Sequence, residues 1–220
     1  MIIRTAILAT LGLAMGVQAH PRGVTNTPID ACSALPRWNN ETNIAGPWSF
    51  QIVGCHNGTD SEGVCGIEGY GATCNAKRLP DKNGIETGII TIADSPHRGQ
   101  TMFRCNGALH TFEAFVPSGA GALDWHAICI RQDPSTGEME WGLGAKNSES
   151  IQAYRQYEHG NPTSGFLVGS SRGAITWAVR HSGSGLSGVD HHPFWFVHLV
   201  GPARTRWTDE FETQIRIDSR

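Results

Sequence analysis

Residues 123–143, LDWHAICIRQDPSTGEMEWGL, contain two segments of alternating side chains on either side of a turn. Leu123–Arg131 leads into the run DPSTG (133–137), and Glu138–Leu143 then alternates between acidic and apolar residues. A period of two is typical of a half-buried strand, and Pro and Gly between two such segments favour a hairpin. This stretch therefore predicts antiparallel β structure.

The rest of the chain shows strand-like patterns of the same kind. They lie at Trp48–Val53, Glu86–Ala93, His110–Val116, Gly165–Val168, Ala174–Arg180, Pro193–Val200 and residues 211–218. We expect Gly165–Val168 and Ala174–Arg180 to form a second hairpin around residues 169–173. About nine strands predict a sandwich, a jelly roll or a barrel.

One segment, Ser148–Glu158, has a helical pattern. Ser148 is a candidate cap, Ile151 and Tyr154 lie on one stripe, and Gly160 is a candidate stop signal. The predicted fold class is therefore mainly β: an antiparallel β-sandwich, jelly roll or barrel with one short helix, stabilised by disulfides.

Charge and hydropathy exclude some function classes. The 220 residues include 17 basic and 20 acidic side chains, a net charge of −3, so a nucleic-acid-binding surface is not expected. A hydrophobic share of 39% is enough for a core. After the N-terminus no stretch is long and apolar enough to predict a membrane span.

The first residues have the pattern of an export signal. Arg4 precedes an apolar run, and Val17-Gln18-Ala19 has the small residues that signal peptidase accepts, which predicts cleavage after Ala19. We expect a signal peptide over 1–19, a flexible segment over 20–38, and a single disulfide-linked β domain over 39–220. The predicted location is outside the cell.

Cysteines and sequons agree with export. An even number of cysteines in an exported chain predicts three disulfides with fifteen possible connectivities. The six cysteines are Cys32, Cys55, Cys65, Cys74, Cys105 and Cys129. Two sequons, at Asn40 and Asn57, are candidate glycosylation sites and favour a eukaryotic secretory route.

The predicted hairpin carries a candidate catalytic group of Asp124, His126, Glu138 and Glu140. If residue 132 pairs with residue 138, all four side chains lie on one sheet face. Three carboxylates and an imidazole there would supply an acid, a base and an orienting partner. A solvated outer face is the alternative, and a register slip of one residue would separate the group.

Two further patterns concern metals. Asp190, His191 and His192 are candidate ligands for zinc or copper. Cleavage after Ala19 would leave His20 first, and in that one residue the chain resembles the copper oxygenases that degrade polysaccharides. A mobile tail is the alternative for His20, and we predict no cofactor.

Two short motifs remain. Residues 169–173, GSSRG, match the nucleophile elbow of hydrolases, with Ser171 as nucleophile, although the alternating segment that follows favours a plain turn between strands. Tyr70, in the Gly-rich stretch between Cys65 and Cys74, is the aromatic residue most expected to be exposed for binding.

No catalytic pattern outweighs its structural alternative, so the sequence favours a secreted, glycosylated β-domain protein that acts by binding an extracellular protein or carbohydrate. Its short length, export signal and cysteine content are similar in profile to effector or virulence proteins. The alternatives are a secreted carbohydrate-active hydrolase that uses the Asp/His/Glu face and a copper oxygenase at His20.

Overall fold

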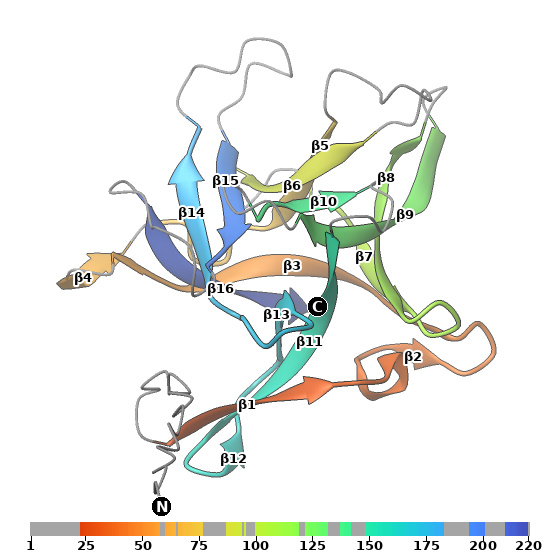
Figure 1. The fold of residues 1–220 in the computed structure, drawn as a ribbon, viewed down its shortest axis with the longest axis horizontal. Coiled ribbons are helices and arrows are strands. Elements are labelled where there is room, and N and C mark those ends of the chain that lie inside the picture. Colours follow the sequence, from red (N-terminus) through yellow and green to blue (C-terminus); the bar gives the residue numbers. More distant parts are fainter. Residues whose placement is uncertain are drawn as a thin grey trace, which may run out of the picture.

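In the computed structural model the protein is almost entirely β (Figure 1). The structure describes residues 23–57, 60–64, 66–76, 87–93, 95, 100–118, 122–131, 137–141, 148–182, 194–200 and 210–219. Within these residues there is no α-helix, and the one helical turn is a 3-10 turn at Cys32–Ala34. The predicted β class is therefore confirmed.

The described residues form sixteen strands, all paired in the antiparallel sense. They are β1 (Val24–Ile29), β2 (Trp38–Asn39), β3 (Ile44–Asn57), β4 (Asp60–Val64), β5 (Ala72–Ala76), β6 (Gly88–Ala93), β7 (Phe103–Asn106), β8 (Thr111–Ser118), β9 (Ala122–Arg131), β10 (Met139–Trp141), β11 (Ser148–Glu158), β12 (Asn161–Pro162), β13 (Phe166–Ser170), β14 (Trp177–His181), β15 (Phe194–Leu199) and β16 (Phe211–Asp218).

Nine of these strands close into a barrel. Pairing runs from β3 through β7, β8, β9, β10, β6, β15 and β14 to β16, and β16 pairs back onto β3. Closure removes most of the sheet edges that an open β protein must protect. The barrel encloses the main hydrophobic core, in which Phe50 of β3 stacks on Phe103 of β7 with ring centroids 3.9 Å apart.

Outer strands extend the barrel at one end. The long strand β11 pairs with β9, β13 and β1, and β13 pairs with β16. In Figure 1, β1 and the far end of β11 run below the barrel, with β12 beyond them. A second, small core of Tyr154, Leu167 and Ile175 lies beneath this extension.

The helix predicted over Ser148–Glu158 is wrong, because the whole segment is β11. Ile151 and Tyr154 are both buried, as the helical stripe required, but they lie on opposite faces of the strand. Both faces of this strand contact a hydrophobic core in its middle part. Buried and exposed residues therefore do not alternate there, and the sequence pattern of a strand is lost.

The predicted second hairpin is also corrected. β13 and β14 do not pair with each other; they lie end to end along one strand, with β13 beside Ile215–Ile217 and β14 beside Phe211–Thr213 of β16. The residues between them form a tight turn in which the Ser170 N–H bonds the Ala174 carbonyl at 2.8 Å.

The cysteines are paired less fully than expected. Cys32 is bonded to Cys105, with Cα atoms 5.6 Å apart, and Cys55 is also in a disulfide. Cys74 and Cys129 are free thiols, which corrects the prediction of three disulfides. The strand order β5–β6–β10–β9 separates them by three strand spacings, roughly 14 Å, beyond the Cα distance that a disulfide spans. Cys65 lies outside the described residues.

The N-terminal part of the described chain is ordered by pairing. Residues 24–29, which we expected in a flexible segment over 20–38, form β1 and pair with β11 along their whole length. The Cys32–Cys105 bond then fixes the following residues to β7. The predicted signal peptide, residues 1–19, lies outside the described residues.

Candidate functional site

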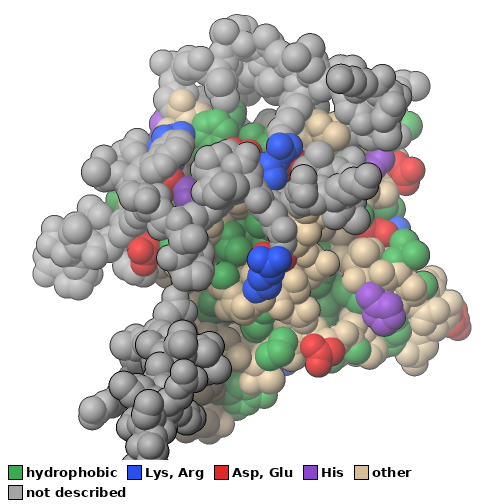
Figure 2. Space-filling view, in the orientation of Figure 1, with side chains coloured by type: hydrophobic (Ala, Val, Ile, Leu, Met, Phe, Trp, Pro, Cys, Tyr) green, Lys and Arg blue, Asp and Glu red, His purple; other side chains and the backbone are tan. Residues whose placement is uncertain are grey.

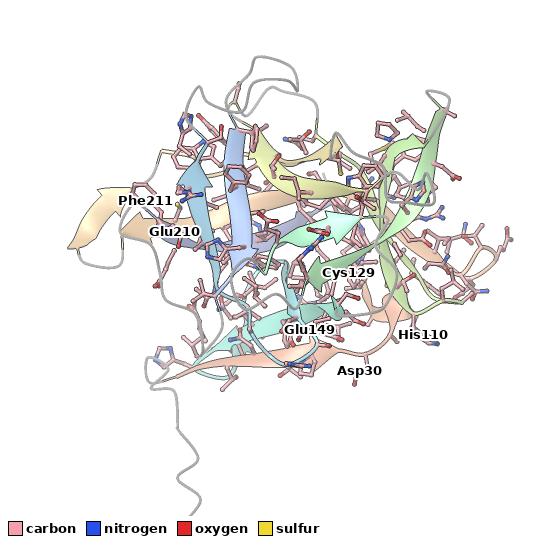
Figure 3. All side chains as sticks on the ribbon, turned by 45° about the horizontal axis from the view of Figure 1, so that its top comes forward. Asp30, His110, Cys129, Glu149, Glu210 and Phe211 are labelled. Atoms are coloured by element: carbon pink, nitrogen blue, oxygen red, sulfur yellow. A yellow bond between two sulfur atoms is a disulfide. The ribbon has the colours of Figure 1, made fainter. Side chains whose placement is uncertain are left out.

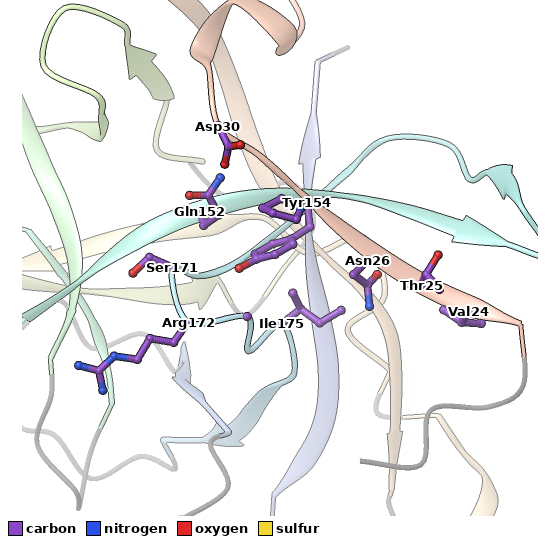
Figure 4. Close-up of a pocket in the computed structure, with 11 residues that line it drawn as sticks. Val24, Thr25, Asn26, Asp30, Gln152, Tyr154, Ser171, Arg172 and Ile175 are labelled. Atoms are coloured by element: carbon purple, nitrogen blue, oxygen red, sulfur yellow. The ribbon is translucent and has the colours of Figure 1, made fainter. Parts of the chain in front are cut away.

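A pocket of about 570 Å³ lies beside the outer strands, a volume usual for ligand sites. We call it the β1–β11 pocket (Figure 4). It is lined by residues of β1, of β11 and of the segment between β13 and β14. These are Val24, Thr25, Asn26, Pro28, Asp30, Gln152, Tyr154, Ser171, Arg172, Gly173 and Ile175.

Strand register explains why these side chains meet. Pro28 lies opposite Tyr154, so even-numbered residues of both strands share one face. This face carries Asn26 on β1, Asp30 directly after it, and Gln152 on β11. The pocket is therefore built along a two-stranded ribbon, with polar residues towards both ends and Pro28 and Tyr154 between them.

The opposite wall is the turn after β13. The Gly173 N–H bonds the Ser170 carbonyl at 3.0 Å, and Gly173 has φ +93°, which favours glycine. The Ser171 N–H bonds the Ser150 carbonyl at 3.0 Å and ties the turn to β11. Since a strand follows instead of a helix, GSSRG is not a nucleophile elbow, and Ser171 is an exposed turn residue.

The polar groups of the pocket are held in different ways. The Tyr154 hydroxyl donates a hydrogen bond to the Ser170 carbonyl, and the Gln152 amide donates one to the Ile29 carbonyl. The Asn26 side-chain oxygen is buried and, among the atoms described, has no hydrogen-bond partner. Buried polar atoms are nearly always satisfied, so this oxygen is an acceptor that a bound water or a ligand donor would satisfy.

The electrostatic environment of the pocket is acidic. Burial raises the pKa of Tyr154, and the charges of Glu149 and Asp30 raise it further, against a backbone hydrogen bond at Gly173 that lowers it. Arg172 is the cation of the lining, but its side chain is 71% exposed and extends away from Tyr154 in Figure 4. Its Nε lies 4.0 Å from Glu149. In Figure 3, Asp30 and Glu149 lie in the lower part of the view.

The predicted catalytic group is divided by the register of the hairpin. Met139 pairs with Ile130 and Trp141 with Ile128, one residue away from the expected pairing. His126 therefore shares a face with Trp141, at 5.7 Å between ring centroids, and Glu138 and Glu140 lie on the other face. Asp124 is exposed near the start of β9. The four residues are not brought together.

Each half of the divided group has other neighbours. Glu140 is fully buried and accepts two hydrogen bonds of 2.8 Å from Arg131. Glu138 forms a β-bridge with His198, whose Nδ1 lies 3.3 Å from the carboxylate of Glu210. In Figure 3, Glu210 lies well apart from Asp30 and Glu149. His198 and Glu210 are distant in sequence from the hairpin, so no local pattern could have indicated them.

The indole nitrogen of Trp141 and Nε2 of His126 are both buried, and no described atom bonds them. A water between the two rings would accept from the indole and donate to the imidazole.

Other predicted site residues fall in several places. Tyr70 is half-buried and packs against the main core, so the expectation of an exposed binding aromatic is wrong. Asn40 is exposed in a turn and accepts a hydrogen bond from Trp38, and Asn57 is the last residue of β3. His20, Asp190, His191 and His192 lie outside the described residues. Within the part of the chain that the structure describes, no three potential ligands form a metal site.

Most of the β1–β11 pocket could not be predicted from local patterns. Asn26 and Asp30 belong to the run VTNTPID (24–30), which lies within the predicted flexible segment. Polar and apolar residues do not alternate regularly in that run, so its sequence does not predict a strand. Gln152 and Tyr154 were placed on a helix.

The chain matches no protein-family model, and no curated protein is significantly similar to it. The search for membrane spans finds no helix of sufficient length and hydropathy in the described part of the chain. On the face shown in Figure 2, the described Lys and Arg side chains are scattered singly.

Proposed function

We propose that the protein is a secreted, extracellular binding protein and that the β1–β11 pocket holds its ligand. One observation carries the proposal: a pocket of ligand size contains a buried amide oxygen, on Asn26, that no described atom satisfies. A ligand donor at that oxygen would remove the penalty of leaving it unpaired.

Export is supported by three features. The first residues have the pattern of a signal peptide, two sequons are present, and the disulfides at Cys32–Cys105 and Cys55 suit an oxidising compartment. With this profile, we place the protein among glycosylated effector or virulence-type proteins that act on an extracellular protein or carbohydrate, with no nucleic-acid partner.

The geometry supports binding better than it supports the alternative hydrolase. That alternative needed Asp124, His126, Glu138 and Glu140 on one face, and the observed register puts Glu138 and Glu140 on the face opposite His126. Glu140 is also fully buried against Arg131. The copper alternative rests on His20, which lies outside the described residues.

Blocking the pocket tests the proposal. A Ser171→Trp variant places a large ring at an exposed turn residue of the pocket wall, and Ser164→Trp is the matched control at an exposed position outside the lining. Both proteins are produced through a eukaryotic secretory pathway with their own leader. Each is applied, beside the wild type, to an array of neutral and acidic oligosaccharides and purified extracellular-matrix proteins.

We expect wild type and Ser164→Trp to bind the same spots, and Ser171→Trp to bind them at least tenfold more weakly, with unchanged thermal unfolding. Equal binding by all three proteins, or no binding by the wild type, contradicts the proposal. So does protein that stays inside the producing cells with its leader attached.

A further inference from the structure

Most of the polar side chains on the pocket face both donate and accept hydrogen bonds. Tyr154 and Ser171 carry hydroxyls, and Asn26 and Gln152 carry amides. A sugar hydroxyl has the same double character, whereas a carboxylate only accepts and an ammonium only donates. This composition therefore matches a ligand rich in hydroxyl groups.

The buried lining atom that no described atom satisfies is an acceptor. The Asn26 oxygen has no partner, and the carboxylate of Asp30 lines the same face. Glu149 stands behind the turn, where its Oε1 accepts from the Arg172 backbone N–H at 2.8 Å. The two carboxylates and one outward-pointing guanidinium leave a net negative charge. A ligand that donates hydrogen bonds is favoured, and an acidic ligand is repelled.

An apolar strip separates the polar groups. Pro28 and Tyr154 face each other across the two strands, and Ile175 lies on the opposite wall. All three belong to the lining, and Tyr154 and Ile175 also form the small core beneath it. Tyr154 and Ile175 are buried and support the wall from behind, and the exposed ring of Pro28 is the apolar surface that a ligand can contact. Such a surface suits the C–H face of a pyranose ring, whose hydroxyls point outward at the rim.

From this arrangement we infer that the β1–β11 pocket binds a neutral saccharide, whose hydroxyls donate hydrogen bonds to Asn26 and Asp30 and whose C–H face rests on Pro28. The inference rests on the proposed function, since it names the ligand of the same pocket. We favour a saccharide over an extended peptide because side-chain hydroxyls and amides from more than one strand converge on the lining. A peptide that adds to the outer edge of β1 is the outcome that the test below must exclude.

The test measures affinity by calorimetry with probes of one length and different charge. The neutral probes are cellohexaose, mannohexaose and chitohexaose, the acidic probe is hexagalacturonate, and hexalysine represents a basic peptide. We expect at least one neutral probe to bind, and hexagalacturonate and hexalysine to bind at least tenfold more weakly than that probe. Equal or tighter binding of the acidic sugar or of the peptide overturns the inference.

Two variants locate the contacts. Asn26→Ala should weaken the neutral probe about 3- to 10-fold, as expected for one lost hydrogen bond, while Thr27→Ala, an exposed neighbour outside the lining, should not. Asp30→Asn should lower the ratio of the affinities for the neutral and the acidic probe at least threefold. Asp124→Asn on β9 should leave this ratio unchanged. Unchanged affinities in Asn26→Ala and Asp30→Asn overturn the inference.

The outcomes separate the two proposals. If no saccharide binds but a matrix protein binds in a manner that Ser171→Trp abolishes, the pocket is a binding site and the saccharide inference fails alone. If Ser171→Trp changes nothing for any probe, both proposals fail.

Discussion

Glu140 is fully buried, and Arg131 satisfies both of its carboxylate oxygens with hydrogen bonds of 2.8 Å. The parallel geometry of guanidinium and carboxylate makes this a strong kind of ion pair. The Arg131 side chain is 36% exposed, so the carboxylate bears most of the loss of hydration. The pair joins neighbouring strands β9 and β10, and its role is therefore best understood as structural.

Replacing Arg131 should be costly, because it removes the cation that offsets the buried carboxylate of Glu140 in the barrel wall. We expect Arg131→Met to lower the free energy of unfolding by about 3 kcal/mol, measured by urea denaturation. The double variant Arg131→Met/Glu140→Met should regain most of that loss, because this buried carboxylate is then removed as well.

The exposed pair Arg172–Glu149 is the control for this prediction. Its ion-pair distance is 4.0 Å and Arg172 is largely exposed, so Arg172→Met should change the free energy of unfolding by less than about 0.5 kcal/mol. A loss in Arg131→Met no larger than in Arg172→Met would show that the buried pair is not stabilising.

Residue types in the hairpin were predictable from sequence, but their partners were not. Alternation located Glu138 and Glu140 on a strand, yet the register differs by one residue from the one we expected. A single step moves every side chain to the other face. The sequence QDPSTG (132–137) is compatible with hairpin loops of more than one length, so it could not decide whether Glu140 faces His126 or Arg131.

At the scale of elements, the alternation of apolar and polar residues predicted strands correctly where one face of the strand is buried. β16 alternates cleanly, and the predicted segments at 48–53 and 110–116 lie almost wholly within β3 and β8. The strand β11 was not recognised because Ile151 and Ala153 pack in the main core and Tyr154 packs in the second core on the other face. Burial on both faces removes the period of two. The strand β1 was not predicted because Thr, Asn and Pro together give a weak strand signal. Pairing with β11 decides its structure.

The turn between β13 and β14 depends on Gly169. A Cβ at this position would lie 2.3 Å from the Ala174 carbonyl oxygen and 2.9 Å from the Ile175 side chain. We expect Gly169→Ala to cost about 1–3 kcal/mol of unfolding free energy, because backbone atoms must move to make room. It should also displace Ser171 and weaken binding at the pocket.

Gly71→Ala is the matched control for Gly169→Ala. The three atoms nearest to its added Cβ all belong to the exposed, flexible side chain of Gln100, so a loss below about 1 kcal/mol is expected by thermal unfolding. Equal losses in the two variants would mean that close packing at the turn is not what requires Gly169.

At the scale of the molecule, the barrel and its outer strands are joined by few connections. β1 pairs only with β11 and β11 reaches the barrel through β9 and β13, within the described residues. The Cys32–Cys105 bond adds a covalent connection between the residues after β1 and β7. An even count of cysteines predicted that disulfides would form, but their partners depend on strand order, which local patterns do not contain.

The Cys32–Cys105 bond should therefore stabilise both the fold and the pocket. It closes a loop with a sequence separation of 73, for which the chain-entropy relation gives about 4 kcal/mol. We expect Cys32→Ala/Cys105→Ala to lose an amount of that order in urea unfolding, and hydrogen exchange in β1 to become faster than in the barrel strands, because β1 then depends on β11 alone.

Cys129→Ala is the control that removes a half-buried thiol without removing a cross-link, and it should cost about 1 kcal/mol. Cys74 serves as an internal reference: burial raises the pKa of its thiol to about 12, so it should resist alkylation in the folded wild type and in the folded fraction of the double variant. If the double variant keeps the wild-type unfolding free energy and slow exchange in β1, strand pairing alone holds the pocket. The disulfide then does not contribute to its stability.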